Sequence, residues 1–288
     1  MNLKAKILSS ISSVSPSLTD SLRYFARYKR LPSKSNPRTL EEKLLVIKHG
    51  LYDSSELVAN CADKYKVREY IEAKGCGFIL NDLYLALPLG EPVDFDLLPE
   101  TFAMKMNTGC GMNYFCKNKF DEMGDICNTI SAWSNYEHTW LASAEMHYEK
   151  IKPYLIFEQY LDIIDEGVED YKVYCFNGKP LAIMLMSGRF SDAGLCKYFM
   201  STDWEYLGIP DNSSSPEPSY IIERPECLDD MIECSKKLSS DFPFVRIDYY
   251  IASNKLYFGE MTFTPSSCIG LSQVTVNGVS MGDFLNID

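Results

Sequence analysis

Two carboxylates lie on one polar face of a predicted hairpin near the end of the chain. In residues 244–265, FVRIDYYIASNKLYFGEMTFTP, polar and apolar side chains alternate on both sides of Ser253 and Asn254, which favour a turn. If the connection between Asp248 and Glu260 contains an odd number of residues, these side chains lie opposite each other, about 5 Å apart. Two such carboxylates repel each other unless a cation lies between them, and Mg²⁺ prefers carboxylate oxygen. The pattern therefore predicts a divalent-cation site, and Mg²⁺ in turn indicates phosphate chemistry.

The same residues also allow a purely structural interpretation. Arg246 and Asp248 stand two residues apart on one strand and can pair with each other, which leaves Glu260 as a solvated edge residue. The choice between the two interpretations depends on the polar residues that accompany this hairpin elsewhere in the chain.

Composition limits the classes of function that fit. The 288 residues suffice for one large or two modest domains, and a net charge of −12 disfavours general binding to nucleic acid or to an anionic membrane surface, local basic patches aside. Ten cysteines without a C-x-x-C pair, together with three histidines, disfavour a zinc site. No stretch has the length or apolarity of a signal peptide or a membrane helix, so we expect a cytoplasmic protein with reduced thiols.

The predicted elements mix helices with antiparallel strands, which indicates the α+β class. Thr39 and Glu42 form the sequence pattern of a capping box, and Asn177-Gly178 is typical of a tight hairpin turn. We expect helices over residues 62–73 and 227–239, and strands over residues 78–80, 102–107, 154–158, 171–176 and 181–186.

Polar residues then recur in a definite order along these elements. The order begins with Asp63 and Lys64 at the start of a helix and ends with the polar face of the hairpin. In full it comprises Asp63-Lys64, Lys105 before Gly109-x-Gly111, Glu158 followed by Gln159-Tyr160-Leu161, Asp170 and Lys172 around Tyr171, and Arg246, Asp248, Glu260 and Thr262.

This order resembles the ATP-grasp superfamily of carboxylate-amine ligases, and most of the chain resembles its TupA-like branch, which is associated with teichuronopeptide and polysaccharide assembly. The resemblance rests on NPRTLEEK, ADKYKVREYI, FAMKMNTGCGMNY, IFEQYL, DYKVYCFNGKP and FVRIDYY…YFGEMTFTP. It implies an ATP-grasp fold, with two α+β subdomains that grip ATP between antiparallel sheets. The implied parts are a reduced helical region (1–75), a small subdomain with a Gly-rich lid loop (76–157) and a large subdomain with the hinge and metal site (158–288).

The resemblance also implies roles for individual residues. These are Lys64, Lys105 and Lys172 on the ATP phosphates, Gly109 and Gly111 in the loop above them, Glu158 and Leu161 at the adenine, Asp170 at the ribose, Asp248 and Glu260 on Mg²⁺, and Arg246 on the transition-state charge. Lys105 would share this catalytic role with Arg246. Thr262 is the third implied Mg²⁺ ligand. It stands where the wider superfamily carries Asn, and its hydroxyl can coordinate Mg²⁺ but is a poorer acceptor than an amide carbonyl. Taken singly, each of these residues also fits an ordinary surface, turn or core position.

The implied activity is an ATP- and Mg²⁺-dependent ligase that acts through an acylphosphate. Its implied partners are an amine or amino acid and a glycan or sugar-nucleotide carboxylate, such as a uronic acid of a surface polysaccharide or capsule, in loose association with the assembly machinery. Arg189 and Lys197 are candidates for holding a carboxylate, and the aromatic residues of 133–148 for stacking on a sugar. The alternatives are a kinase-like phosphotransferase on a glycan precursor and a catalytically silent module that binds ATP or glycan.

Overall fold

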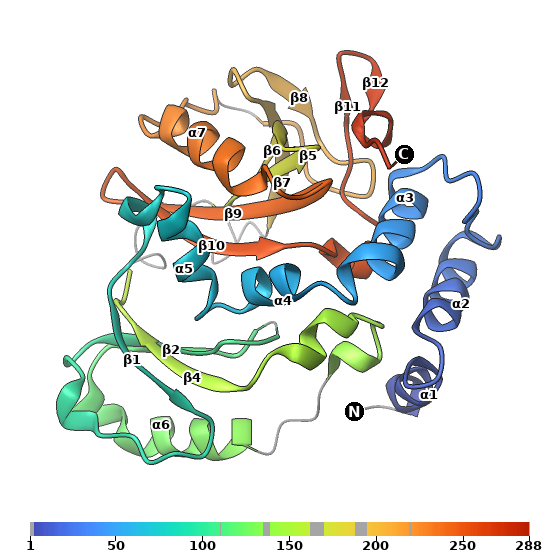
Figure 1. Cartoon of the computed structure of the whole chain (residues 1–288). Helices are drawn as coiled ribbons and strands as arrows, with labels where there is room; N and C mark the ends of the chain where they lie inside the picture. The colour runs from blue at the N-terminus through green and yellow to red at the C-terminus, as the bar shows by residue number, and fades with distance from the viewer. Residues whose placement is uncertain are drawn as a thin grey trace.

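Two antiparallel sheets, with helices packed around them, make up the structure (Figure 1). The computed structural model describes residues 3–109, 111–134, 139–161, 170–187, 195–218 and 221–287. Within these residues helices and antiparallel strands are mixed, so the predicted α+β class is confirmed.

The smaller sheet has the strand order β1-β4-β2-β3. Its strands are β1 (Leu83–Pro88), β2 (Phe102–Met106), β3 (Asn113–Cys116) and β4 (Tyr154–Glu158). Alternate β2 residues Phe102, Met104 and Met106 are buried in one apolar cluster with Phe157 of β4, and helix α6 (Lys119–Ser134) packs on β3. Because alternate strand residues face opposite sides, Lys105 is directed away from this cluster.

The larger sheet has the strand order β10-β9-β5-β6-β7-β8, and helix α7 (Leu228–Ser239) packs on β5, β6 and β9. The strands are β5 (Asp170–Phe176), β6 (Lys179–Ser187), β7 (Cys196–Ser201), β8 (Tyr206–Gly208), β9 (Phe244–Ala252) and β10 (Lys255–Thr262). The turns Asn177-Gly178 and Ser253-Asn254 have positive φ at both residues, as two-residue hairpins with this twist require. Both predicted hairpins are confirmed.

The remaining helices precede the sheets in the chain. They are α1 (Leu3–Ser12), α2 (Pro16–Tyr28), α3 (Leu40–Ile47), α4 (Glu56–Ala62) and α5 (Val67–Ala73), and a short ribbon of β11 (Thr275–Val276) and β12 (Val279–Ser280) lies near the C-terminus. Helix α4 contacts β10, whereas α1 and α2 lie at the outer edge of the molecule (Figure 1). None of the helices in the described ranges combines the length and apolarity needed to cross a bilayer.

Two local predictions differ from the structure. Residues 78–80 were expected to form a strand, but residues Gly77–Ile79 form a 3₁₀ turn, and the strand β1 begins only at Leu83. A three-residue apolar run does not by itself distinguish these two states. The helix expected over residues 62–73 is interrupted, because the Asp63 side chain accepts hydrogen bonds from the backbone N–H groups of Tyr65 and Lys66 and forms a turn before α5.

The capping box predicted at Thr39 is confirmed at the start of α3. The Glu42 carboxylate accepts hydrogen bonds from the backbone N–H groups of Ser33, Arg38 and Thr39 and pairs with Arg30. Burial by itself raises the pKa of Glu42, but these donors outweigh it and lower that pKa to about 2. The charged carboxylate therefore stabilises the connection between α2 and α3.

Replacing Glu42 by Gln is expected to lower the free energy of unfolding by about 2 kcal/mol at neutral pH. Because the folded-state pKa is depressed, the contribution of the carboxylate is complete above its ordinary pKa and is lost as the pH falls toward about 2. Urea denaturation of both proteins at neutral pH and at about pH 3 measures the change. Glu56→Gln, on an exposed helix start, is the control with little effect. A difference between Glu42→Gln and wild type that does not vary with pH would contradict this assignment.

Candidate functional site

The hairpin β9–β10 brings its two carboxylates onto one face. Asp248 pairs with Glu260, and the next polar pair along the same face joins Arg246 to Thr262. The pairing is regular from the turn as far as Phe258, and then shifts by one residue at Gly259. Without this β-bulge, Glu260 would oppose Ile247 and face the other side of the sheet. The predicted opposition of Asp248 and Glu260 is confirmed, and the bulge is its physical cause.

Asp248 lies at the centre of a buried ion cluster. The Arg246 guanidinium donates to both carboxylate oxygens at 2.7 Å, and the Lys172 ammonium donates to one of them. Lys172 also pairs with Asp170 at 2.9 Å, and β5 lies beside β9 with Lys172 opposite Asp248. Burial alone raises the pKa of the Asp248 carboxyl, but the charges of Arg246 and Lys172 hold it below its ordinary value. Asp248 is therefore ionised.

Glu260 extends this cluster toward solvent. One of its carboxylate oxygens lies 3.6 Å from Arg246 and accepts from the Thr262 hydroxyl at 3.3 Å. The other lies 3.8 Å from the Lys64 ammonium, and 40% of the Glu260 side-chain surface is exposed. Lys64 also donates to the carbonyl of Gly109 at 2.9 Å. The Gly-rich loop therefore lies within reach of the polar face of the hairpin.

Asn107 fixes the position of both Lys64 and the Gly-rich loop. Its backbone carbonyl accepts from the Lys64 N–H at 3.0 Å, and its buried side chain bonds to the Lys152 carbonyl and the Tyr154 N–H. The loop that follows β2 is thus tied to β4 and to the start of α5. Sequence reasoning missed this role, because a single Asn after a strand carries no distinctive spacing.

A second ion cluster lies on the smaller sheet. Lys105 donates to Glu158 at 2.7 Å, and Arg68 lies 3.5 Å from the other Glu158 oxygen. Burial alone raises the pKa of Glu158, but the Lys105 charge and hydrogen bond, followed by the Arg68 charge, lower it below its ordinary value. Lys105 and Glu158 were both predicted as site residues, whereas Arg68 was missed. Its only signal was its place one helical turn after Lys64.

The structure gives fewer contacts for the other predicted site residues than for the charged residues of the two ion clusters. Gly109 and Gly111 have φ of +80° and +79°, which glycine adopts without strain. Leu161 follows β4 in the chain and is half-buried. Lys197 lies in β7, and its backbone N–H bonds to the Ser215 hydroxyl. Arg189 and part of residues 133–148 lie outside the described residues.

The oxygen atoms of Asp248, Glu260 and Thr262 fit a hard divalent cation only if further ligands complete its shell. Among the residues that the structure describes, no group of three His, Cys, Asp or Glu side chains could hold a metal ion. Asp248 and Glu260 supply two carboxylates on one face, with the Thr262 hydroxyl beside them. Mg²⁺ commonly takes one or two carboxylates and completes its shell with phosphate oxygens and water. The pair therefore fits Mg²⁺ that is bound together with a phosphate ligand, provided that Asp248 shares its oxygens between the ion and the hydrogen bonds from Arg246 and Lys172.

A carboxylate missed by sequence reasoning lies beyond the end of β10. Glu145 accepts hydrogen bonds from the hydroxyls of Ser143, Thr264 and Ser267. No cation of the described residues pairs with it. Thr264 stands two residues after Thr262, so Glu145 is held just past the end of β10.

The backbone beside Glu145 is strained. Ser266, Ser267 and Cys268 all have positive φ, a conformation that side-chain-bearing residues seldom adopt in succession. Backbone strain of this kind is concentrated at functional sites.

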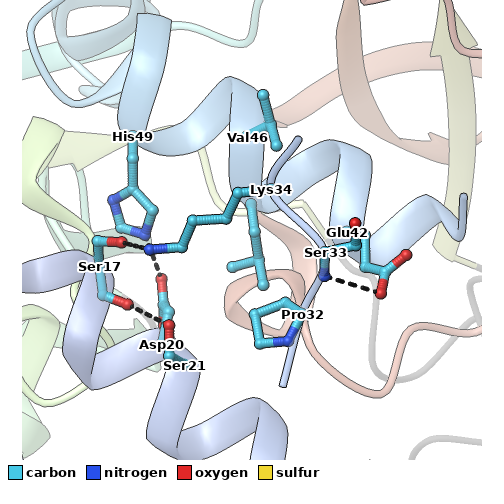
Figure 2. A pocket seen from close by; sticks show the side chains of 10 residues that line it. Ser17, Asp20, Ser21, Pro32, Ser33, Lys34, Glu42, Val46 and His49 are labelled. Carbon is cyan, nitrogen blue, oxygen red and sulfur yellow. Dashed lines mark hydrogen bonds and ion pairs between the residues drawn. The ribbon is translucent and has the colours of Figure 1, made fainter. Parts of the chain in front are cut away.

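A well-formed cavity of about 190 Å³ lies elsewhere, between α2 and α3 (Figure 2). Asp20, Lys34, Glu42 and His49 line it, and none of them is a predicted site residue. We propose the ion clusters as the functional site instead, because cations and the paired carboxylates lie together there.

Two antiparallel sheets, a Gly-rich loop bonded to Lys64, and paired acids on the hairpin β9–β10 agree with the ATP-grasp fold that the sequence resemblance implied. A model of the TupA-like ATP-grasp family matches residues 43–275, and the chain belongs to that family. No curated protein matches the chain.

Three solved structures illustrate how far the similarity extends. The D-alanine–D-alanine ligase of Bacillus anthracis, complexed with ATP, is 18% identical, with a TM-score of 0.44 over 72% of this chain and 57% of that one. The corresponding ligase of Helicobacter pylori is 18% identical, with a TM-score of 0.40 over 73% and 56%. Phosphoribosylglycinamide synthetase of Anaerococcus prevotii is 12% identical, with a TM-score of 0.40 over 77% and 48%. The chain thus spans about half the length of these proteins.

Proposed function

We propose that this protein is an ATP- and Mg²⁺-dependent ligase that joins a carboxylate to an amine through an acylphosphate. The proposed carboxylate is a uronic acid of a surface-polysaccharide precursor, and the amine is an amino acid or related compound. We further propose a cytoplasmic site of action and a division into residues 1–75, 76–157 and 158–288, with ATP between the last two parts.

The observation that supports this proposal is the alternation of opposite charges across the site. Contacts of at most 3.8 Å connect five side chains of alternating charge in a row, which are Lys64, Glu260, Arg246, Asp248 and Lys172. Cations that are positioned by fixed carboxylates are suited to binding a polyphosphate and to stabilising charge that develops during phosphoryl transfer. Membership of the ATP-grasp family makes ATP the natural polyphosphate.

The chemistry assigned to the residues is mainly positioning and charge neutralisation. The substrate carboxylate attacks the γ-phosphorus of ATP, which gives an acylphosphate and releases ADP. The amine then attacks the acyl carbon, inorganic phosphate leaves, and the amine loses a proton. In this proposal Arg246 and Lys172 would stabilise the charge on the transferred group. Mg²⁺ held by Asp248 and Glu260 would supply neutralisation of phosphate charge.

For the amine, we propose Glu145 as the binding residue. Its carboxylate is half-buried, held by three hydroxyls and free of a cation among the described residues. A protonated amino group would supply the missing charge, and the strained residues 266–268 would form the adjacent wall.

The function is tested with purified protein, ATP, Mg²⁺ and panels of uronic acids and amines. We expect phosphate release that requires both a carboxylate and an amine, with a product whose mass equals their sum less one water. A stable phosphorylated product formed without amine would instead identify a phosphotransferase. ATP binding without turnover on any pair would favour the silent module.

Two substitutions should affect different substrates. Lys64→Met removes a cation beside the Gly-rich loop and is expected to raise the KM for ATP by about tenfold, with the KM for the amine unchanged.

Glu145→Gln is expected to raise the KM for the amine by a similar factor and to leave the KM for ATP unchanged. Steady-state kinetics with each substrate varied in turn measures both. If both variants changed the same KM, the separate assignment of the two residues would be wrong.

A further inference from the structure

Helix α2 presents its apolar side to solvent. Leu18, Leu22 and Phe25 are exposed, at 50%, 42% and 49% of their surfaces. Their spacing of four and then three residues places them on one face of the helix. In a surface helix of a globular protein, such a face is normally packed against the core. The orientation of α2 is therefore the reverse of the usual one.

An ion network fixes this reversed orientation. The buried face of α2 carries Thr19, Asp20 and Tyr24. Asp20 pairs with Arg23 at 2.7 Å and with the fully buried Lys48 at 2.6 Å. It also lies 3.1 Å from His49, as Figure 2 shows for these two side chains. Rotating the apolar face inward would separate Asp20 from Lys48 and leave a buried charge without its partner, which is strongly unfavourable. The exposed stripe is thus a stable feature of the fold.

Basic side chains are concentrated on α1 and around the C-terminal end of α2. The first 38 residues contain eight Lys or Arg residues and only one acidic residue, whereas the whole chain has a net charge of −12. Arg27, Lys29 and Arg30 are exposed at the C-terminal end of α2. On α1, Leu3 and Ile7 are exposed one turn apart, beside two exposed lysines. Helices α1 and α2 precede the segment matched to the ATP-grasp family, and none of their residues belongs to the two ion clusters.

We propose that the outer face of α1 and α2 docks on the surface of an anionic lipid bilayer. Apolar side chains flanked by Lys and Arg are the features of helices that lie in the bilayer interface, where the basic groups meet lipid phosphates. The strongly acidic remainder of the chain is repelled by such a surface, so this patch determines how the protein approaches it. In a twofold-symmetric dimer formed through the same face, two basic patches would repel each other. An anionic bilayer accommodates both the apolar and the basic side chains of this face.

Vesicle co-sedimentation tests this surface. The full chain is expected to bind vesicles of phosphatidylcholine with phosphatidylglycerol, to bind phosphatidylcholine alone far more weakly, and to dissociate as salt is raised. The double variant Leu22→Gln, Phe25→Gln should weaken binding by roughly tenfold or more, because two apolar side chains no longer enter the interface. The double variant Arg27→Glu, Lys29→Glu should weaken binding and reduce its salt dependence. All variants should keep wild-type circular dichroism and ATP turnover in solution.

Ile221→Gln is the matched control, because Ile221 is 87% exposed and lies far along the chain from α2. It should bind vesicles as the wild type does. The proposal is wrong if the wild type does not bind the anionic vesicles, or if the α2 variants bind as tightly as Ile221→Gln. It is also wrong if sedimentation velocity shows a wild-type dimer that the Leu22, Phe25 variant abolishes, since a second copy would then cover this face. These outcomes are independent of the ligase assay.

Discussion

Replacing Glu260 by Gln is expected to lower ATP turnover by about 10²–10³-fold while the folded structure is kept. The Glu260 side chain is 40% exposed, and its ion pairs with Lys64 and Arg246 are long, at 3.8 and 3.6 Å. Exposed pairs of this kind contribute little to stability. Gln has the same shape but no charge, so it would be a much weaker partner for a cation bound with phosphate. Turnover at varied Mg²⁺ concentration measures the effect, which should include a greater requirement for Mg²⁺.

Asp248→Asn, unlike Glu260→Gln, is expected to lose stability as well as turnover. Asp248 is buried and binds both Arg246 and Lys172. Its neutralisation would leave Arg246 with only the 3.6 Å contact to Glu260 and Lys172 with Asp170 alone. We therefore expect a loss of stability by about 3 kcal/mol in addition to the loss of turnover. Glu205→Gln, at an exposed position between β7 and β8, is the control for a charge change on the same sheet. Full turnover in purified Glu260→Gln would refute the metal assignment.

The features that the sequence predicted well are local or periodic. Alternation identified the polar face of β9 and β10, and Asn177-Gly178 identified the hairpin between β5 and β6. These patterns depend on backbone geometry that repeats every two residues or on a turn that only certain residues allow. The order of the motifs then identified the family, because an ordered set of weak signals is more specific than each of its members.

The features that the sequence did not predict arise from contacts between distant segments. The ion pair of Arg68 with Glu158 joins residues 90 positions apart, and the hydrogen bond from Thr264 to Glu145 joins residues 119 apart. Each partner has no local pattern, because its role is set only when the sheets and helices have packed. The reversed helix α2 was missed for a related reason, since periodicity identifies an apolar face but does not say which side packs on the protein.

Gly259 was also missed, although it controls the register that the main prediction required. A two-residue turn at Ser253-Asn254 alone would place Asp248 and Glu260 on opposite faces of the sheet. The bulge adds one residue to β10 and so brings Glu260 onto the same face as Asp248. A glycine within a strand often marks such a bulge.

Gly259→Ala is therefore expected to lower ATP turnover by about a hundredfold and to destabilise the fold by about 1–3 kcal/mol. A Cβ at this position would lie 2.9 Å from the Asp248 carbonyl oxygen and 2.9 Å from a ring carbon of Tyr250, closer than such atoms approach in proteins. The backbone of β9 cannot yield without moving Asp248 away from Glu260. The added methyl group thus acts on the carboxylate pair without touching either side chain.

The matched control is Gly124→Ala in the exposed part of α6, where a Cβ meets nothing within 4 Å. Alanine is a better helix former than glycine by about 1 kcal/mol, so this variant should keep full turnover and unfold at the same or a higher temperature. Turnover, the Mg²⁺ requirement and thermal unfolding should be measured for both variants. If Gly259→Ala lost stability but retained turnover and its normal Mg²⁺ requirement, the bulge would be a packing feature only. The opposition of the two acids would then not be what activates ATP.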